Sequence, residues 1–120
     1  MAFTSYKDLK VWQKAMDLTD IIYSLCKMLP PNETYALSDQ MRRAVVSIPS
    51  NIAEGQGRQT EKEFKNFLSI ARGSCFEIET QLLICQRQNY LSESDIQPAL
   101  NLVEEIGKML TAFILRLSKN

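Results

Sequence analysis

Apolar residues recur at alternating spacings of four and three positions along most of this 120-residue chain. The clearest run comprises Phe64, Leu68, Ala71, Cys75, Ile78, Leu82 and Cys85. This spacing places the apolar side chains on one face of an α-helix, as in helices that pack lengthwise against each other. Strands would instead show apolar residues at every second position, a pattern that the sequence lacks. The sequence therefore predicts an all-α protein.

The same periodicity divides the chain into four helical segments, expected at about residues 8–28, 33–55, 60–89 and 95–117. Short connections between consecutive helices favour antiparallel neighbours. A chain of this length is typical of one domain and can bury an adequate core. We therefore expect residues 1–120 to form a single antiparallel, up-down-up-down four-helix bundle.

Residues that begin or end helices separate the first three segments. Two prolines at positions 30 and 31 end the first helix, because proline disfavours helical geometry in the residue before it. Asn32 is the expected N-cap of the second helix. Gly55 or Gly57 is expected to end that helix in left-handed geometry. Thr60 and Glu63 have the spacing of a capping box, which predicts the start of the third helix.

Three residues compete to cap the fourth helix, namely Ser92, Ser94 and Asp95. Asp95 is favoured because it would place Pro98 in the first turn, where proline is tolerated. The fourth helix is therefore expected to begin close to residue 95.

Pro49 lies inside the periodic pattern of the second segment. A proline within a helix removes one backbone hydrogen bond and costs about 3 kcal/mol or more. Because helical spacing continues on both sides, we predict one continuous helix that is kinked at Pro49. The alternative is a break, after which Ser47 would cap a second short helix.

The composition excludes several kinds of chemistry. The 14 basic and 14 acidic residues give zero net charge, which argues against a purely electrostatic nucleic-acid binder. The chain has no histidine, so it lacks the usual general base and the commonest metal ligand. Cys26, Cys75 and Cys85 form no CxxC pair and are expected to be free thiols in a reducing cytosol.

No other motif indicates a chemical site. The GQGR stretch at 55–58 lacks both phosphate-loop patterns, and no carboxylate–histidine motif is present for a metal. We therefore expect no catalytic residue, cofactor, metal or small-molecule substrate. No signal-peptide h-region or membrane-spanning apolar run occurs, so we expect a cytoplasmic protein that makes no membrane contact.

The charges are unevenly distributed in spite of the neutral total. An up-down bundle brings the N-terminus, the 55–59 connection and the C-terminus to one end, which carries an excess of basic residues. Residues 77–105 instead carry six acidic residues and only one basic residue, Arg87. The basic end either contacts an anion or merely complements helix dipoles and solvent. The residues that would contact a nucleic acid are Lys7, Lys10, Arg58, Lys62, Lys65 and Arg116.

Two further rows indicate contacts between subunits. The second helix carries a polar row at helical spacing, and the third carries large apolar residues outside its main row. A monomeric bundle has little use for both, because exposed apolar surface favours association. The expected interface residues are Arg43, Ser47, Ser50, Glu54, Phe67, Ile70, Phe76 and Leu83.

Four stretches resemble a known family. They are LKVWQKAMDL at 9–18, RRAVVSIPSNIAEGQGR at 42–58, FLSIARGSCFEIETQL at 67–82 and EIGKML at 105–110. The chain resembles the S23 type of four-helix bundle, also called 23S ribosomal RNA intervening-sequence proteins. This resemblance implies a bacterial protein that forms an antiparallel four-helix bundle and assembles as a ring, typically a homopentamer, with no established enzymatic role.

The accessory variability protein of diversity-generating retroelements is similar to this family. It is basic and associates with nucleic acid and a reverse transcriptase, whereas this chain has zero net charge. The residue patterns predict a non-enzymatic interaction module with a subunit interface, and the resemblance implies that it forms a ring, typically a homopentamer. The alternative is an accessory protein that binds RNA or DNA weakly through its basic end.

Overall fold

The computed structural model describes residues 5–119 and contains four long helices. In chain order the elements are a 3-10 turn η1 (Tyr6–Asp8), α1 (Lys10–Cys26), a 3-10 turn η2 (Pro31–Glu33), α2 (Leu37–Gln56), α3 (Glu61–Arg87) and α4 (Glu93–Ser118). No strand occurs within residues 5–119. The predicted all-α class and four-helix bundle are therefore confirmed.

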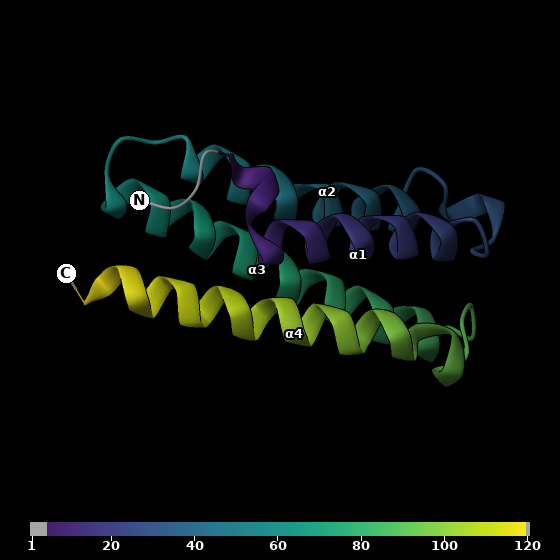
Figure 1. Cartoon of the computed structure of the whole chain (residues 1–120). Coiled ribbons are helices and arrows are strands. Elements are labelled where there is room, and N and C mark those ends of the chain that lie inside the picture. Colours follow the sequence, from purple (N-terminus) through teal and green to yellow (C-terminus); the bar gives the residue numbers. More distant parts are fainter. Residues whose placement is uncertain (1–4, 120) are drawn as a thin grey trace.

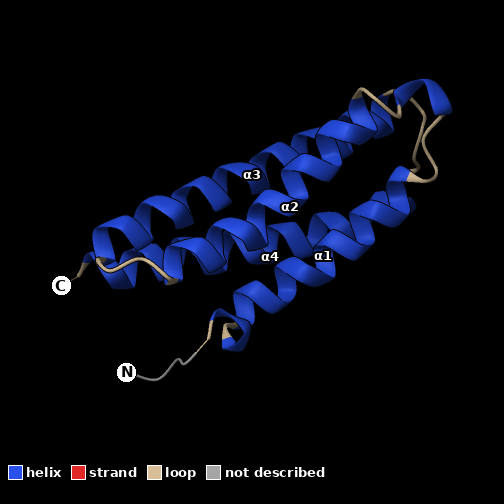
Figure 2. Ribbon diagram, turned by 90° about the horizontal axis from the view of Figure 1, so that it is seen from above, coloured by secondary structure: helices blue, strands red, loops and turns tan. Residues whose placement is uncertain are grey.

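The helices run lengthwise in a bundle that measures 46 × 22 × 20 Å (Figures 1 and 2). α1 packs against α2 and α4, and α3 packs against the same two helices. α1 and α3 therefore occupy diagonal corners of the bundle. As a result, the edge formed by α1 and α2 lies opposite the edge formed by α3 and α4.

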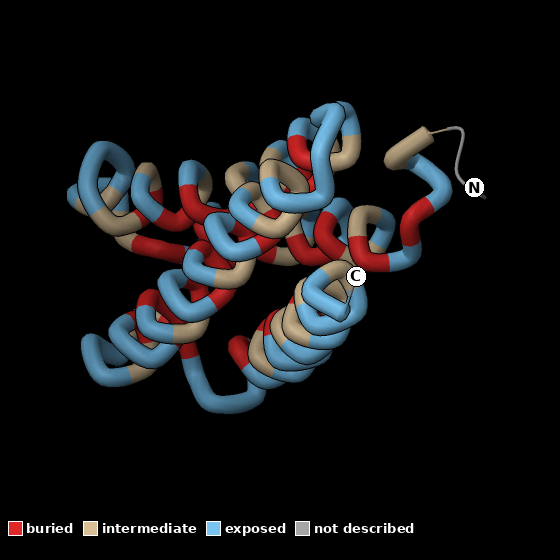
Figure 3. Tube along the Cα trace, turned by 90° about the vertical axis from the view of Figure 1, so that its left-hand side faces the viewer, coloured by how far each residue is buried: buried red, intermediate tan, exposed pale blue. Residues whose placement is uncertain are grey.

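The periodic apolar rows form the core. Buried residues face the inside of the bundle, and exposed residues cover its outside (Figure 3). The predicted row of α3 is buried from Leu68 to Cys85, and Phe64 at its start packs partly buried against the same core. The other helices contribute fully buried residues at the same spacing, among them Leu18, Ile22, Met41, Ile48, Ile52, Ile96, Ile106 and Leu110.

α2 is one continuous helix through Pro49, and the Pro49 side chain is buried. Continuity excludes the alternative in which Ser47 caps a second short helix. The kink at Pro49 stays a prediction.

The predicted start of α2 at residue 33 is wrong, and so is Asn32 as its cap. Pro31–Glu33 form a 3-10 turn instead, and α2 begins at Leu37 after Ala36, which has no polar side chain. The carboxylate of Glu33 accepts a hydrogen bond of 3.2 Å from the backbone N–H of Leu37. Glu33 therefore satisfies a helix N-terminus that lacks a capping side chain of its own.

The glycines at the end of α2 do not adopt the expected left-handed geometry. Within residues 5–119 no glycine has a positive φ, and Gly57 has a φ of −82°. Gly55 is buried, and a Cβ added there would lie 2.7 Å from the Cβ of Phe67 and 2.9 Å from the Cδ1 of Phe64. Gly55 therefore allows α2 and α3 to approach closely, and the cap prediction is wrong.

Both ends of α3 have recognisable caps. The Thr60 hydroxyl accepts a hydrogen bond of 3.1 Å from the backbone N–H of Glu63, which confirms Thr60 as the N-cap. After Arg87, Asn89 adopts a left-handed φ of 61°. The N–H of Tyr90 then donates a hydrogen bond of 2.9 Å to the carbonyl of Cys85. This pattern is a Schellman motif in which Asn89 takes the place usually held by glycine.

Ser92, and not Asp95, caps α4. The Ser92 hydroxyl accepts from the N–H of Asp95 at 3.0 Å, and the Asp95 carboxylate accepts from the N–H of Ser92 at 2.9 Å. This reciprocal pair satisfies two backbone donors, whereas a cap at Asp95 would satisfy only one. Pro98 therefore lies one turn deeper in the helix than we expected, on the exposed side.

Candidate functional site

Large apolar side chains are exposed on the outer surface of α3. Phe76 is 60% exposed, Ile70 52%, Leu83 48% and Ile84 39%. Phe76 and Leu83, seven residues apart, share one side of α3, and Ile70 and Ile84, fourteen apart, share another. Three of these four were predicted as interface residues. Exposure of this kind on one helix marks a surface that associates with something apolar.

Phe67, the fourth predicted apolar residue of the interface, lies mainly inside the subunit. It packs where Gly55 of α2 comes close to α3, and it is half-buried. The guanidinium of Arg58 lies 4.8 Å from the centre of its ring, which is cation–π geometry. Phe67 therefore joins α2 to α3 and offers less surface to a partner than Phe76 does.

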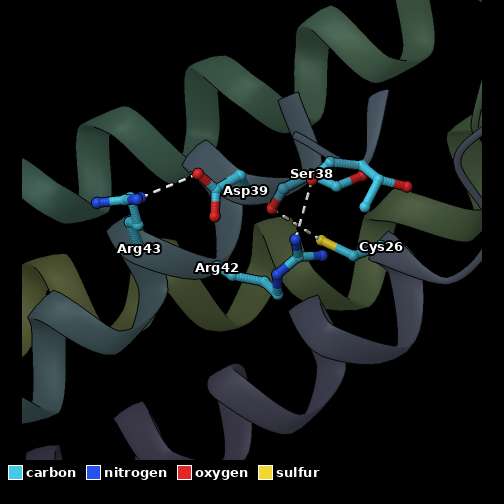
Figure 4. Close-up of polar contacts among 6 residues, drawn as sticks. Cys26, Ser38, Asp39, Arg42 and Arg43 are labelled. Carbon is cyan, nitrogen blue, oxygen red and sulfur yellow. Dashed lines mark hydrogen bonds and ion pairs between the residues drawn. The ribbon is translucent and has the colours of Figure 1, made fainter. Parts of the chain in front are cut away.

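The members of the polar row of α2 make different contacts. Arg43 pairs with Asp39 at 3.0 Å, as Figure 4 shows, and Glu54 pairs with Arg58 at 2.7 Å. Both pairs are exposed and join residues one helical turn apart, so each contributes little to stability. Ser50 is exposed along the groove between α1 and α2.

Ser47, the remaining member of that row, faces α3. The hydroxyl of Ser74 donates to the Ser47 hydroxyl at 2.9 Å. The side-chain amide of Asn51 donates to the Ser47 carbonyl at 2.7 Å and to its hydroxyl at 2.9 Å. Asn51 and Ser74 were missed from the sequence, although Ser74 lies seven residues from both Phe67 and Gln81 and so shares their side of α3.

The three cysteines are free and buried. Burial and the nearby Glu79 raise the pKa of the Cys75 thiol to about 12. Burial, with Cys26 and Glu33 nearby, raises the pKa of Cys85 to about 11. Burial also raises the pKa of Cys26, whose thiol donates to the Ser38 carbonyl at 3.7 Å (Figure 4). All three stay protonated at neutral pH and are poor nucleophiles.

The predicted nucleic-acid residues are brought together only in part. The connection between α2 and α3 and the last turn of α4 lie at one end of the bundle, whereas α1 begins part-way along it (Figure 1). We call this the basic end, formed by Arg58, Lys62, Lys65 and Arg116. Lys14 of α1 pairs with Glu105 of α4 at 3.0 Å. The thirteen residues of α4 that follow Glu105 therefore extend beyond the level of Lys14, toward the basic end.

Lys7 and Lys10 therefore lie to the side of the basic end. Lys10 and Arg116 line the same groove, between the start of α1 and α4. Two of the basic side chains, those of Arg58 and Arg116, already make contacts within the subunit. Arg58 contacts Glu54 and Phe67, and the guanidinium of Arg116 lies 5.1 Å from the ring centre of Phe113. The structure thus places four of the six predicted residues at this end.

A groove of about 510 Å³ between α3 and α4 was not predicted. We call it the α3/α4 groove; Phe76 and Leu115 rise from its two sides. Glu79 and Glu104 also line it, and the pKa of Glu79 is raised by burial and by the charge of Glu104. No signal in the sequence alone reveals this pair, because it depends on how α3 is aligned against α4.

Among residues 5–119 no group of three or more metal-ligating side chains comes together. None of the helices in the described part of the chain is long and apolar enough to cross a membrane.

These features define an antiparallel four-helix bundle whose candidate sites are apolar and basic surfaces. The family model described as 23S rRNA-intervening sequence protein matches residues 7–112. The chain belongs to this family, which confirms the resemblance inferred from its sequence motifs.

A solved structure agrees with this assignment. It is a protein with unknown function from the S23 ribosomal protein family of Bacteroides thetaiotaomicron VPI-5482, and it is similar with a TM-score of 0.80 and 31% sequence identity. The alignment covers 87% of this chain and 97% of the other. No curated protein matches the chain. Neither the family nor this neighbour is described as an enzyme.

Proposed function

We propose that this protein is a non-enzymatic interaction module that assembles with copies of itself into a ring, as a homopentamer. The exposed apolar surface of α3 carries this proposal, above all Phe76 and Leu83. Apolar area removed from water contributes roughly 25 cal/mol per Å². Each side chain gains only part of that contribution within one subunit, whereas a neighbouring subunit could bury the remainder.

The exposed polar residues of α2 suit the edge of an interface on another side of the subunit. Arg43, Ser50 and Glu54 are exposed on α2, and interfaces combine an apolar centre with a polar, solvated rim. A cyclic ring joins two different surfaces of each subunit. A bundle with exposed apolar residues on more than one helix meets this requirement.

We place the protein in the cytoplasm of a bacterium. Three buried, protonated thiols without a disulfide suit a reducing compartment. The bacterial origin is supported by the similar protein from Bacteroides thetaiotaomicron.

Light scattering of wild type and a Leu83→Asp variant tests the proposal. A charge at this half-exposed position should weaken association and lower the mass in solution, because it would have to be desolvated at the interface. Tyr35→Asp is the matched control, because Tyr35 is 94% exposed but lies in the connection before α2. Equal masses for all three proteins would remove the α3 surface from the interface.

A second candidate function is an accessory role with RNA or DNA. The basic end supports it, because Arg58, Lys62, Lys65 and Arg116 come from three separate parts of the chain. A ring would place several copies of this end on one face and so increase the effective affinity. We expect binding to be weak at 150 mM salt, since few phosphates are neutralised per subunit and affinity falls steeply with salt.

Fluorescence anisotropy with a labelled RNA distinguishes the two candidates. Submicromolar binding at about 150 mM salt that Lys62→Glu and Lys65→Glu abolish would favour the accessory role. Binding that is absent at this salt concentration agrees with the neutral interaction module.

A further inference from the structure

The bundle exposes a second apolar surface, on the side opposite the α3/α4 groove. A groove between α1 and α2 is lined by Trp12, Met16, Val46 and Pro49, and both Met16 and Val46 are 41% exposed. Tyr23 lies seven residues beyond Met16 on α1 and therefore extends the same side. We call this surface the α1/α2 face.

Arg42 adds a positive charge to the α1/α2 face. It precedes Val46 by four residues and Pro49 by seven, so the three share one side of α2. Its guanidinium donates to the carbonyl of Thr34 at 3.0 Å, and its charge acts on Cys26 of α1 (Figure 4). Arg42 is half-buried on the side of α2 next to α1.

The α3/α4 groove carries the opposite charge at the corresponding height. Arg72 reaches Thr111 across the two helices at 3.4 Å. α3 and α4 run antiparallel. Glu79 follows Arg72 by seven residues, and Glu104 precedes Thr111 by seven, so the two glutamates lie at the same height along the bundle. Lys108 lines the groove on the other side of this level, toward Leu115.

Arg42 lies at nearly the same level as the acidic pair. Ser47 on α2 contacts Ser74 on α3, and these two helices are antiparallel. Arg42 precedes Ser47 by five residues on α2, and Glu79 follows Ser74 by five residues on α3. The acidic pair and the arginine thus lie at similar heights on opposite sides of the bundle.

We propose that the α3/α4 groove binds the α1/α2 face of a second copy of this chain. Phe76, Leu83 and Leu115 would then cover Met16, Tyr23 and Val46, and Arg42 would approach Glu79 and Glu104. Such a contact joins two different surfaces head to tail, so each subunit keeps one free groove and one free face until a ring closes. The inference rests on the proposed self-association and names its surfaces.

Mixing two variants tests this arrangement. Phe76→Asp blocks the groove and leaves the α1/α2 face intact, whereas Val46→Asp blocks the face and leaves the groove intact. Each variant alone should be a 13.7 kDa monomer. An equimolar mixture should give a dimer of about 27 kDa, twice 13.7 kDa, because one intact groove meets one intact face. An interface between two identical surfaces would give no such recovery.

The outcomes separate this inference from the proposed function. A monomeric wild type would contradict self-association itself. An oligomeric wild type whose two variants form no dimer on mixing would overturn only the pairing of groove with face. Circular dichroism verifies that each variant keeps its helices, and Phe76→Ser with Val46→Ser replaces the pair if an aspartate prevents folding.

A charge exchange provides a second measurement. Arg42→Glu should lower the mass of the assembly, and Glu79→Arg with Glu104→Arg in the same chain should restore it. Lys119→Glu is the control, because Lys119 follows the end of α4 and is exposed. Failure of the added arginines to restore assembly would exclude Arg42 as the partner of the acidic pair.

Discussion

The hydroxyl of Ser74 on α3 donates a hydrogen bond of 2.9 Å to the hydroxyl of Ser47 on α2, two residues before Pro49. Ser74 is buried, and Asn51 binds the same Ser47 hydroxyl from one turn further along α2. Two small residues at this point therefore fix the alignment of α2 and α3 beside the proline.

Replacing both serines should reveal this coupling. Ser74→Ala should lower the free energy of unfolding by about 1 kcal/mol, the usual net contribution of one such hydrogen bond. The double variant with Ser47→Ala should cost less than the sum of the single changes, because both remove the same contact. Urea unfolding of the four proteins measures the difference, and strictly additive effects would show that the bond contributes nothing.

Gly55→Ala should destabilise the protein. A Cβ at Gly55 would lie 2.7 Å from the Cβ of Phe67, a side-chain atom fixed to the backbone of α3, so α2 and α3 must move apart. Forcing atoms into a packed contact costs about 1–3 kcal/mol.

Gly107→Ala on α4 is the control for this change. An added Cβ at Gly107 would meet no atom within 4 Å in the described part of the chain. Alanine there should therefore stabilise the helix by about 0.5–1 kcal/mol. Thermal unfolding that ranked Gly55→Ala above Gly107→Ala in stability would contradict the close approach of α2 and α3.

Gln81→Leu should stabilise the protein. Gln81 is buried, and within residues 5–119 its Oε1 has no hydrogen-bond partner, while its amide N–H reaches Glu77 only at 3.4 Å. Leaving a buried acceptor unsatisfied costs about 1–3 kcal/mol, which an apolar side chain of similar size avoids. Gln97→Leu, at an exposed position of α4, should change little; a loss of stability in Gln81→Leu would show that the amide has a partner.

The buried thiols should make stability depend on pH above 9. The pKa of Cys75 is raised from 9.0 to about 12 and that of Cys85 to about 11. Because the unfolded thiols ionise first, their contribution is complete below pH 9 and is lost as the pH rises toward these folded values. Cys75→Ala should reduce this loss in urea titrations between pH 8 and 11, which sets the effect of the thiol apart from that of lysines and tyrosines. An unchanged pH dependence in the variant would contradict burial as the cause.

The periodic rows were predictable because burial repeats with the helical period. The residues from Leu68 to Cys85 lie in the core as their spacing predicts, and the continuity of α2 through Pro49 follows from spacing on both sides of it. The exposure of Phe76 and Leu83 was also foreseen, since they lie outside the main row of α3.

Features that depend on alignment between segments were not predictable. Glu33 caps α2 from a preceding turn, and Gly55 is required by side chains that belong to another helix. The choice of Ser92 over Asp95 as a cap depends on their reciprocal hydrogen bonds, since both residue types are suitable alone. Glu79 and Glu104 are separated in the sequence and meet only because α3 and α4 pack in one particular alignment.

Sedimentation equilibrium of the wild-type protein over a range of concentrations tests the central claim most directly. The method reports the mass of the assembly without assuming its shape. A homopentamer predicts about 68 kDa, five times the 13.7 kDa of one chain, at all concentrations above the dissociation constant. Another multiple of 13.7 kDa would retain self-association and exclude the pentamer, whereas a mass of 13.7 kDa throughout would contradict self-association altogether.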